Sequence, residues 1–280
     1  CEEQLGFRRF RSCQEQLHNL YNILLSRKSQ GLPTCAAFLD MVKAHDCVWK
    51  EGFLVKLARC GATGRMWRTL RSFHSAFRLR LHNWVAPTAT RIAETWTSDR
   101  GLPQGANTSC VSFDLHINDI MVDLKGRGLG VSVSGLRVPG LMVADDIVPL
   151  APSAAELSTS PAVVEEHFYN WRLKLNPSPK SSLMVVGTPE FRRANADLTI
   201  LCAVQRLAVI STHKHLGVCI QDDLQWQQQV DEMASNASKA SGALAWCCRK
   251  SRGIRPRTAL HLCNAIVRQL LECGSEVWSL

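Results

Sequence analysis

Several features that would place this chain in a particular class are missing from it. No run of about 18 apolar residues occurs, so we predict no membrane-spanning segment. The first residues, Cys1-Glu2-Glu3-Gln4, lack the basic-then-apolar layout of a secretory signal. No internal repeat and no low-complexity tract is visible. We therefore expect an intracellular globular protein, nuclear or cytoplasmic, that is not secreted.

The cysteines lack the spacings of zinc sites and of small disulfide frameworks. No Cys-x-x-Cys pair occurs among the 12 cysteines, and Cys247-Cys248 are adjacent, which does not match the usual spacing of zinc ligands. The others are scattered between Cys1 and Cys273. We expect reduced thiols, several of them in the core.

What the chain has in excess is positive charge. Its 280 residues are 46% hydrophobic and 20% charged, which is typical of one large globular domain or two smaller ones. The formal net charge of +9 favours a polyanionic partner. From Lys50 to Arg100 ten basic residues stand against three acidic ones. This stretch is either a solvated face or a phosphate-binding surface.

Hydrophobic periodicity predicts alternating helices and strands in the first part of the chain. A capping box from Ser12 to Glu15 opens the first helix. The apolar run from Cys35 to Leu39 predicts a strand that is buried on both faces and ends in Asp40. The expected elements are helices over 13–27, 50–59 and 66–77 and strands over 35–39 and 77–81. The expected inner stripe of the helix over 66–77 is Met66, Trp67, Leu70, Phe73 and Phe77.

The remaining residues continue this mixture. A glycine-rich loop, Gly101 to Gly105, leads into one long helix that ends near Leu124. Pro161 is expected to interrupt or restart a later helix, and Pro149 to require a sheet edge or a bulge. The further expected elements are a hairpin over 141–148 with Asp145-Asp146 at its turn, a helix from Ser153 to Trp171, a turn holding Lys180 between 173–176 and 182–186, a strand over 216–220 and helical periods from Asp222 onward.

Three carboxylates fall at strand ends or turns: Asp40, Asp145 and Asp146. Aspartate is a common turn residue, so the adjacent pair has an ordinary structural explanation. The alternative is a metal site, because hard divalent cations prefer carboxylate oxygens. Three carboxylates can bind two Mg²⁺ ions about 4 Å apart, the arrangement used for in-line phosphoryl transfer. This chemistry suggests a nucleotidyl transferase without fixing which one.

A set of short motifs follows one another over nearly the whole chain. They are Gln4-Leu5-Gly6-Phe7-Arg8 with Arg11-Ser12, Phe38 to Trp49 around Asp40, Gly101 to Gly105 with Ser109, Phe113 and Ile117-Asn118-Asp119, Ala144-Asp145-Asp146-Ile147, Trp171 with Leu175-Asn176 and Lys180-Ser181, His215-Leu216-Gly217-Val218, and Gly274-Ser275-Glu276-Val277-Trp278. In this order they resemble the motifs of reverse transcriptases from non-LTR (LINE-type) retrotransposons.

The resemblance implies a fold and a function. The fold is α+β: a right-hand polymerase with a palm whose antiparallel sheet packs on helices, incomplete fingers and a helical thumb. The chain would divide into a remnant of the fingers (1–34), a palm (35–220) with fingers-side helices (50–77), and a thumb-like helical region (221–280). The function would be RNA-directed DNA polymerisation, with an RNA template, a DNA primer and dNTPs as partners and no membrane.

The resemblance also assigns roles to residues. Asp40, Asp145 and Asp146 would be catalytic and bind two Mg²⁺ ions, with Mn²⁺ as the alternative, for attack by a primer 3′-OH. His45 stands where an aromatic ring normally blocks a ribose 2′-OH. Lys180 would protonate pyrophosphate or steady its charge, or is an ordinary exposed lysine. The nucleotide-binding set is His45, Gln104, Gly105 and Lys180. The nucleic-acid-binding set is Arg78, Arg80, Arg249, Lys250 and Arg252.

Several positions depart from the family pattern, and other hypotheses stay open. Val143 replaces the aromatic residue before Ala-Asp-Asp, Pro103 replaces a basic or polar residue, and Pro179 is an extra residue. Asp46 and Asp119 are expected to be surface or capping groups rather than ligands. One alternative is a truncated, catalytically decayed module that only binds nucleic acid. Another is a different two-metal enzyme such as a nuclease.

Overall fold

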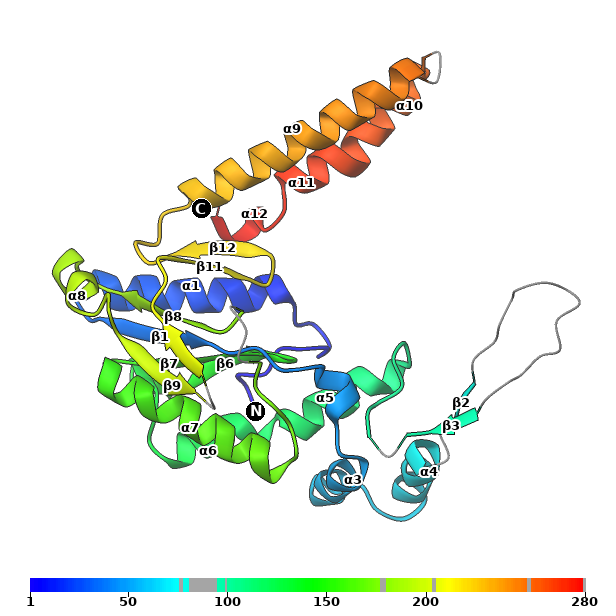
Figure 1. The fold of residues 1–280 in the computed structure, drawn as a ribbon, viewed down its shortest axis with the longest axis vertical. Coiled ribbons are helices and arrows are strands. Elements are labelled where there is room, and N and C mark those ends of the chain that lie inside the picture. Colours follow the sequence, from blue (N-terminus) through cyan, green and yellow to red (C-terminus); the bar gives the residue numbers. More distant parts are fainter. Residues whose placement is uncertain are drawn as a thin grey trace, which may run out of the picture.

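A four-stranded antiparallel sheet lies at the centre of the molecule, with strand order β6-β7-β1-β8 (Figure 1). A computed structural model of the chain describes residues 1–75, 78–80, 95–98, 100–176, 180–202, 205–250 and 253–278. The sheet strands are β1 (Thr34–Phe38), β6 (Gly140–Val143), β7 (Asp146–Ala151) and β8 (Ser182–Val186). Helices and antiparallel strands alternate along the chain, which confirms the predicted α+β class.

Helices flank the sheet and follow the predicted capping signals. The helix expected over 13–27 is α1 (Cys13–Ser29), whose N-cap Ser12 accepts a hydrogen bond from the Glu15 N–H. The helix expected over 50–59 is α3 (Lys50–Arg59). The other helices before residue 200 are α2 (Ala44–Cys47), α4 (Gly64–Ser75), α5 (Asn107–Ile117), α6 (Asp119–Gly126), α7 (Ala154–Asn170) and α8 (Pro189–Ala194).

Both faces of the central sheet are covered, because side chains alternate across a strand. Cys35, Ala37 and Leu39 belong to the core that also contains the apolar residues of α5, α6 and α7. Ala36 and Phe38 belong to a second core, formed with α1. Figure 1 shows α1 on one side of the sheet and α6 and α7 on the other. All five residues of β1 are therefore buried, as the continuous apolar run predicted.

Four two-stranded antiparallel hairpins complete the β structure of the described residues. They are β2 (Arg78–Arg80) with β3 (Thr95–Thr97), β4 (Val131–Val133) with β5 (Leu136–Val138), β9 (Thr199–Cys202) with β10 (Gln205–Ala208), and β11 (Thr212–His215) with β12 (Val218–Gln221). The strand expected over 216–220 starts later, because Leu216 and Gly217 form the turn with φ of 47° and 87°. The strand expected over 77–81 coincides with β2, whose side chains lie outside the described residues.

Two helix predictions are wrong in detail. The long helix after the glycine-rich loop is two helices, α5 and α6, which meet at Asn118. On α4, Met66 and Phe73 are 55% and 43% exposed instead of forming the inner stripe, whereas Trp67 and Leu70 pack against the core. α4 lies at the margin of the molecule beyond α3, which is its main packing partner among the described elements (Figure 1). Phe77, the last residue of the expected stripe, lies outside the described residues.

Pro161 does not interrupt its helix. α7 runs without a break over 17 residues from an N-cap at Ser153, whose side chain accepts a hydrogen bond from the Glu156 N–H. Pro161 removes one backbone hydrogen bond, but it is buried together with Val163 and Val164 against the sheet. Apolar burial along the whole inner face therefore outweighs the local loss.

Pro149 lies in β7, an interior strand, so the expectation of an edge or a bulge is wrong. Leu39 and Ile147 exchange two backbone hydrogen bonds between β1 and β7, of 2.9 and 3.1 Å. Pro149 lies two residues further on and faces the same neighbour without an N–H, so one rung of this ladder is missing. On the other side it pairs with Gly140, where a Cβ would lie 2.5 Å from the Val148 carbonyl oxygen. Glycine at 140 lets the β6–β7 pair close.

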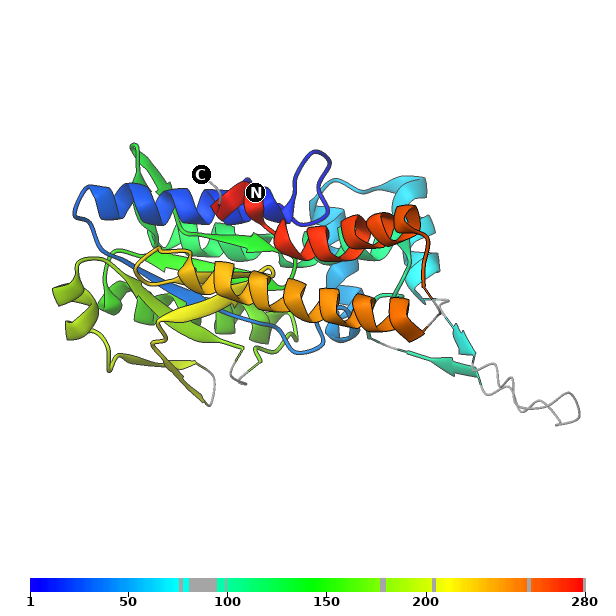
Figure 2. The ribbon, with the colours of Figure 1, turned by 90° about the horizontal axis from the view of Figure 1, so that it is seen from above.

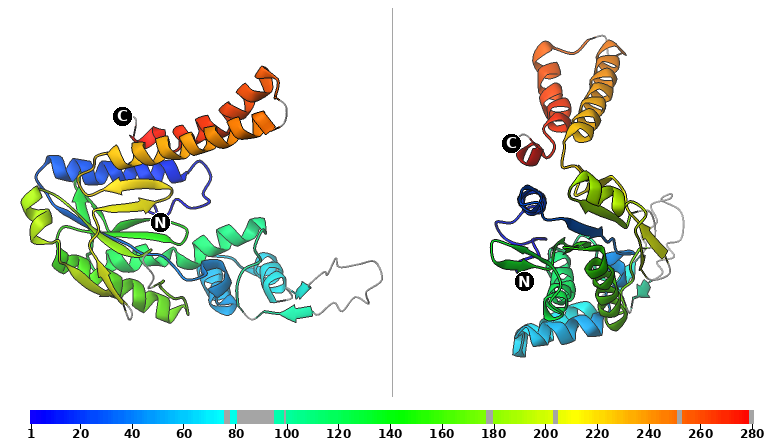
Figure 3. Two further views of the ribbon diagram at one scale, coloured as in Figure 1. Left: turned by 45° about the horizontal axis from the view of Figure 1, so that its top comes forward. Right: turned by 90° about the vertical axis from the view of Figure 1, so that its left-hand side faces the viewer.

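A helical hairpin at the C-terminal end projects from β11 and β12 (Figure 1, Figure 3). The outgoing helix is α9 (Gln227–Lys250), and the returning segments run beside it (Figure 2). These are α10 (Pro256–Leu262), a π-helical turn η1 (Cys263–Arg268) and α11 (Gln269–Leu271), followed by α12 (Ser275–Trp278). Val277 of α12 is buried in the same core as α1. The division into 1–34, 35–220 and 221–280 stays a prediction.

The cysteines confirm the prediction of reduced thiols, several of them in the core. All 12 cysteines are free thiols, and Cys35, Cys202 and Cys219 are buried. Over the ranges that the structure describes, no helix combines the length and the apolar character needed to cross a membrane.

Candidate active site

The pairing of β1 with β7 brings the three predicted carboxylates to one end of the sheet. Asp40 follows β1 directly, and Asp145 and Asp146 lie where β6 turns into β7. The antiparallel register pairs Cys35 with Ala151 and Leu39 with Ile147, so the next position places Asp40 opposite Asp146. Residues opposite each other in an antiparallel pair project from the same face of the sheet. Two carboxylates far apart in sequence therefore become cross-strand neighbours.

The Asp40 carboxylate is held by residues of the segment that precedes β8. The Asn176 side-chain amide donates a hydrogen bond of 2.8 Å to Asp40 Oδ2, and Lys180 Nζ lies 3.8 Å from the same oxygen. The Asp40 N–H donates to Ser181 Oγ at 3.1 Å, and the Asn176 N–H to the Asp40 carbonyl at 2.8 Å. These bonds fix the backbone and one carboxylate oxygen. The Lys180 side chain is 71% exposed and free to reach a ligand beside Asp40.

Asp146 has the most perturbed environment of the three. Burial, and after it the negative charges of Asp145 and Asp40, raise the pKa of Asp146 to about 6 against the opposing effect of Lys180. The site thus concentrates negative charge that one nearby lysine only partly balances. Such a place favours a bound cation.

The residues present are of the type that binds a divalent metal ion, but they do not surround a metal position completely. Carboxylate oxygens are the ligands that Mg²⁺ and Mn²⁺ prefer, and Mg²⁺ usually takes few protein ligands and completes its shell from phosphates and water. In the described part of the chain, however, no group of three or more His, Cys, Asp or Glu side chains converges closely enough to hold a metal ion by itself. The arrangement of Asp40, Asp145 and Asp146 is therefore an open site that a phosphate-bearing substrate would complete.

The tip of the β6–β7 hairpin is a two-residue turn, Ala144-Asp145, supported from below. Ala144 has a φ of 51°, which is unusual for a residue with a side chain. The buried Gln4 Oε1 accepts hydrogen bonds from the Ala144 N–H at 3.2 Å and from the Gly6 N–H at 2.8 Å. Gln4 also forms a parallel bridge with Met142, which adds the N-terminal segment to the edge of the sheet beside β6.

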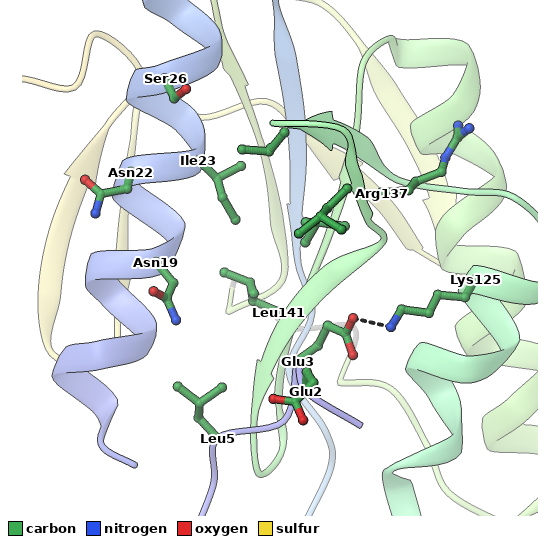
Figure 4. Close-up of a pocket in the computed structure, with 13 residues that line it drawn as sticks. Glu2, Glu3, Leu5, Asn19, Asn22, Ile23, Ser26, Lys125, Arg137 and Leu141 are labelled. Atoms are coloured by element: carbon green, nitrogen blue, oxygen red, sulfur yellow. Dashed lines mark ion pairs between the residues drawn. The ribbon is translucent and has the colours of Figure 1, made fainter. Parts of the chain in front are cut away.

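An ion pair anchors this N-terminal segment to α6. Glu3 pairs with Lys125, as Figure 4 shows, on the wall of a pocket of about 570 Å³ between α1 and the β4–β5 hairpin. Gln16 of α1 donates a hydrogen bond to the Glu3 carbonyl at 3.3 Å and another to the Met142 carbonyl at 3.2 Å. The N-terminal segment that contacts the β6–β7 hairpin is therefore bound to α6 on one side of the sheet and to α1 on the other.

The glycine-rich loop lies against the short helix that follows Asp40. The Leu102 N–H donates to the His45 carbonyl at 2.8 Å, and the Gln104 side-chain amide to Asp46 Oδ1 at 2.9 Å. The His45 ring stacks on Phe113 with centroids 4.7 Å apart. The loop residue Gly105 is exposed with a φ of 81°, a conformation that glycine tolerates best. His45, Gln104 and Gly105 are thus gathered by one loop, and Asp46 is a partner of Gln104.

The structure does not bring the predicted basic residues of the C-terminal region to the carboxylates. Arg249 and Lys250 are exposed at the outer end of α9. That helix has 24 residues, so it is about 36 Å long, and its outer end lies far from the sheet (Figure 1). Arg252 and the side chains of Arg78 and Arg80 lie outside the described residues.

A buried lysine that the sequence did not single out joins α3 to α6. Lys56 is 2% exposed, donates to the His116 carbonyl, and lies 3.2 Å from Asp119 Oδ2 and 3.9 Å from the centre of the Trp171 ring. Burial lowers the pKa of Lys56 to about 8, although Asp119 raises it. Asp119 is therefore the ion-pair partner of Lys56, and its side chain, 43% exposed in the first turn of α6, also has the predicted surface position.

Three residues that hydrogen-bond to Asp40 or to the turn before Asp145 received no role in the sequence-based prediction. They are Gln4, Asn176 and Ser181, which contact Ala144 or Asp40. All three lie in motifs that resemble those of a known family. Their position in these motifs could therefore have identified them, whereas their residue types alone could not. Their contacts depend on long-range packing.

Comparisons with known proteins agree on one family. Residues 1–231 match the family described as reverse transcriptase (RNA-dependent DNA polymerase). The RNA-directed DNA polymerase from mobile element jockey of Drosophila funebris is 23% identical over 236 residues, which make up 82% of this chain and 24% of that protein. The chain thus spans about a quarter of the length of this relative.

Solved structures give the same fold at low sequence identity. Apo telomerase from Candida tropicalis matches with a TM-score of 0.52 at 10% identity, covering 79% of this chain and 36% of that one. The form truncated from the C-terminal domain matches with a TM-score of 0.52 at 11% identity, covering 79% and 39%. The likeness concerns the arrangement of elements.

Proposed function

The chain belongs to the reverse transcriptase (RNA-dependent DNA polymerase) family, and on that premise we propose that it transfers nucleotides from dNTPs to a primer 3′-OH on an RNA template. The observation that carries the proposal is the placement of Asp40 opposite Asp146 and next to the Ala144-Asp145 turn. In-line phosphoryl transfer with two divalent ions requires negative side chains that bind both ions, and the three carboxylates supply this negative charge.

Each residue of the site has a part in this proposal. Asp40, Asp145 and Asp146 would hold two Mg²⁺ or Mn²⁺ ions, which when bound would lower the pKa of the attacking hydroxyl and stabilise the charge on the phosphate. Lys180, beside Asp40, meets the leaving pyrophosphate. His45, Gln104 and Gly105 receive the incoming nucleotide. Asn176 keeps one Asp40 oxygen oriented.

The proposal extends to partners and location. Template RNA and primer DNA would contact the basic groups at Arg78, Arg80, Arg249, Lys250 and Arg252, since guanidinium and ammonium groups neutralise phosphates. A nucleic-acid partner places the protein inside the cell, in the nucleus or the cytoplasm.

A second candidate is a module that binds nucleic acid without polymerising. The open arrangement of the three carboxylates favours it, together with Val143 in place of an aromatic residue. The two candidates differ in one measurable property, which is extension of a primer.

Primer extension on an RNA template with Mg²⁺ and dNTPs separates the candidates. The proposal expects extension by the wild type, loss of extension by Asp145→Asn, and no loss for Asp197→Asn, which changes an exposed aspartate elsewhere. No extension by the wild type, with nucleic-acid affinity that falls steeply with salt, would establish the binding module instead. Shortening of the labelled strands would indicate a nuclease.

A further inference from the structure

We propose that α4 presents a contact surface for single-stranded nucleic acid, separate from the carboxylate site. The α4 surface consists of Arg65, Arg68, Thr69, Ser72 and Phe73, which line one open hollow of about 520 Å³. Two guanidinium groups, two hydroxyl groups and an aromatic ring meet there. The helix contains no acidic residue at any of its positions.

The charge of the α4 surface is not neutralised within the described part of the chain. No carboxylate of that part lies within ion-pair distance of Arg65 or Arg68. Other exposed arginines do have such partners, for example Arg127 with Glu166 and Arg193 with Glu190. Two arginines on one helix face without carboxylate partners favour a binding site for an anionic ligand over a face that is merely solvated.

The mixture of groups points to a phosphodiester strand. Guanidinium groups form charge-assisted hydrogen bonds with phosphate oxygens, and serine and threonine hydroxyls commonly add to them. Phe73, 43% exposed beside them, offers a flat apolar face on which an unpaired base can stack. Bases in a duplex are already stacked on one another, so the ring selects a single strand.

This inference takes its partner class from the proposed function but not its chemistry, since it requires binding alone. The helix α4 lies beyond α3, away from β6 and β7 (Figure 1). A strand held there would lie outside the reacting positions. Loss of the surface should therefore weaken binding of long strands and leave the extension of a short, tightly annealed primer–template intact.

Binding of labelled single-stranded RNA and of DNA of the same sequence tests the surface over a series of salt concentrations. Arg65→Gln with Arg68→Gln should reduce the slope of log affinity against log salt by about 1.4, at about 0.7 for each lost phosphate contact. Phe73→Ala should weaken binding roughly 5- to 150-fold. The charge-matched control is Arg127→Gln with Arg193→Gln, which should leave the slope unchanged.

Comparison of the RNA and the DNA measurements shows which kind of strand the α4 surface prefers. Stronger binding of RNA than of DNA, by a margin that Thr69→Val with Ser72→Ala removes, would show that these hydroxyls contact the 2′-OH. Equal binding would show a phosphate and base contact alone. If the double variant binds with the same affinity and slope as the control, the α4 surface is not a nucleic-acid contact, even when the wild type extends primers.

A second inference rests on a different observation: we infer that Gln4 is a positioning residue for Asp145 and Asp146. Gln4 is 2% exposed, and its Oε1 accepts the N–H of Ala144 immediately before the two carboxylates. A Cβ at Gly6 would lie 2.7 Å from the Ala144 nitrogen, so the segment and the turn are in close contact. One side-chain oxygen therefore fixes the position of a strained turn relative to the N-terminal segment.

Gln4→Met tests this role, because methionine fills a similar volume without an acceptor. We expect turnover to fall about 10-fold or more while KM for dNTP and the affinity for primer–template stay unchanged, and amide exchange at Ala144 to become faster. Gln4→Glu keeps an oxygen at the same reach and should recover part of the turnover. This inference rests on the proposed function, but the exchange measurement does not: unchanged exchange at Ala144 overturns it even if the wild type is inactive.

Discussion

Replacement of Asp146 with asparagine should stabilise the fold at neutral pH, because the wild-type carboxylate is ionised where burial and two neighbouring carboxylates oppose its charge. The pKa of Asp146 rises from 3.8 to about 6, which at about 1.4 kcal/mol for each tenfold change in proton affinity corresponds to at most about 3 kcal/mol. Asp146 is partly exposed, so solvent screens the repulsion, and we expect about 1–2 kcal/mol.

The sign of the pH dependence follows from linkage. Between about pH 4 and pH 6 the folded state binds more protons at Asp146 than the unfolded state does, so the free energy of unfolding of the wild type falls as pH rises through this window. The asparagine variant lacks this fall. Its advantage over the wild type should therefore be smallest near pH 4 and constant above about pH 6.

Denaturant unfolding of both proteins at pH 4.5, 6 and 8 measures this difference. Asp197→Asn, at an exposed position, serves as the control and should match the wild type at each pH. Mg²⁺ should narrow the gap at pH 8, because a cation bound to the wild-type carboxylates stabilises the folded state. An asparagine variant that is equally or less stable than the wild type at pH 8 would refute the repulsion argument.

Four other outcomes follow from the same structure. Primer extension should decline as pH falls through about 6, because Asp146 becomes protonated; a profile that is flat from pH 8 to pH 5 would contradict this. His45→Phe should exclude ribonucleotides more strongly than the wild type, measured as the ratio of dNTP to rNTP incorporation, and an equal ratio counts against the role of His45. Gly140→Ala should destabilise the fold by about 1–3 kcal/mol in denaturant unfolding, because its Cβ would lie 2.5 Å from the Val148 carbonyl oxygen. Lys56 has its pKa lowered from 10.5 to about 8, so the stability of the wild type should rise between pH 8 and pH 10.5, and Lys56→Met should remove that rise.

Local patterns were enough to predict the elements but not their neighbours. The capping box at Ser12 and the apolar run before Asp40 gave α1 and β1 nearly to the residue, since both signals act within one turn or one strand. Helical period also put Met66 and Phe73 on an inner face, but among the described elements α4 packs mainly against α3, and both side chains are exposed. Periodicity states which residues share a face; it does not state what covers that face.

The candidate site shows the same division. Asp40, Asp145 and Asp146 were identifiable as carboxylates at strand ends, whereas their cross-strand register depends on the pairing of β1 with β7. Lys56 resembles any exposed helical lysine in sequence, and only the packing of α3 against α5 buries it. Pro149 was expected at an edge or a bulge because proline cannot donate to the ladder, but Gly140 opposite it makes a regular interior position feasible.

The register that places Asp40 opposite Asp146 also determines when the site can exist during folding. The β6–β7 hairpin is local and can form early, with Asp145 and Asp146 already adjacent. Asp40 joins only after a loop of roughly a hundred residues closes, at an entropic cost on the order of 4 kcal/mol. A partly folded chain, or a fragment starting after Asp40, would therefore carry two carboxylates and lack the third. Assembly of the site is a late event that reports completion of the sheet.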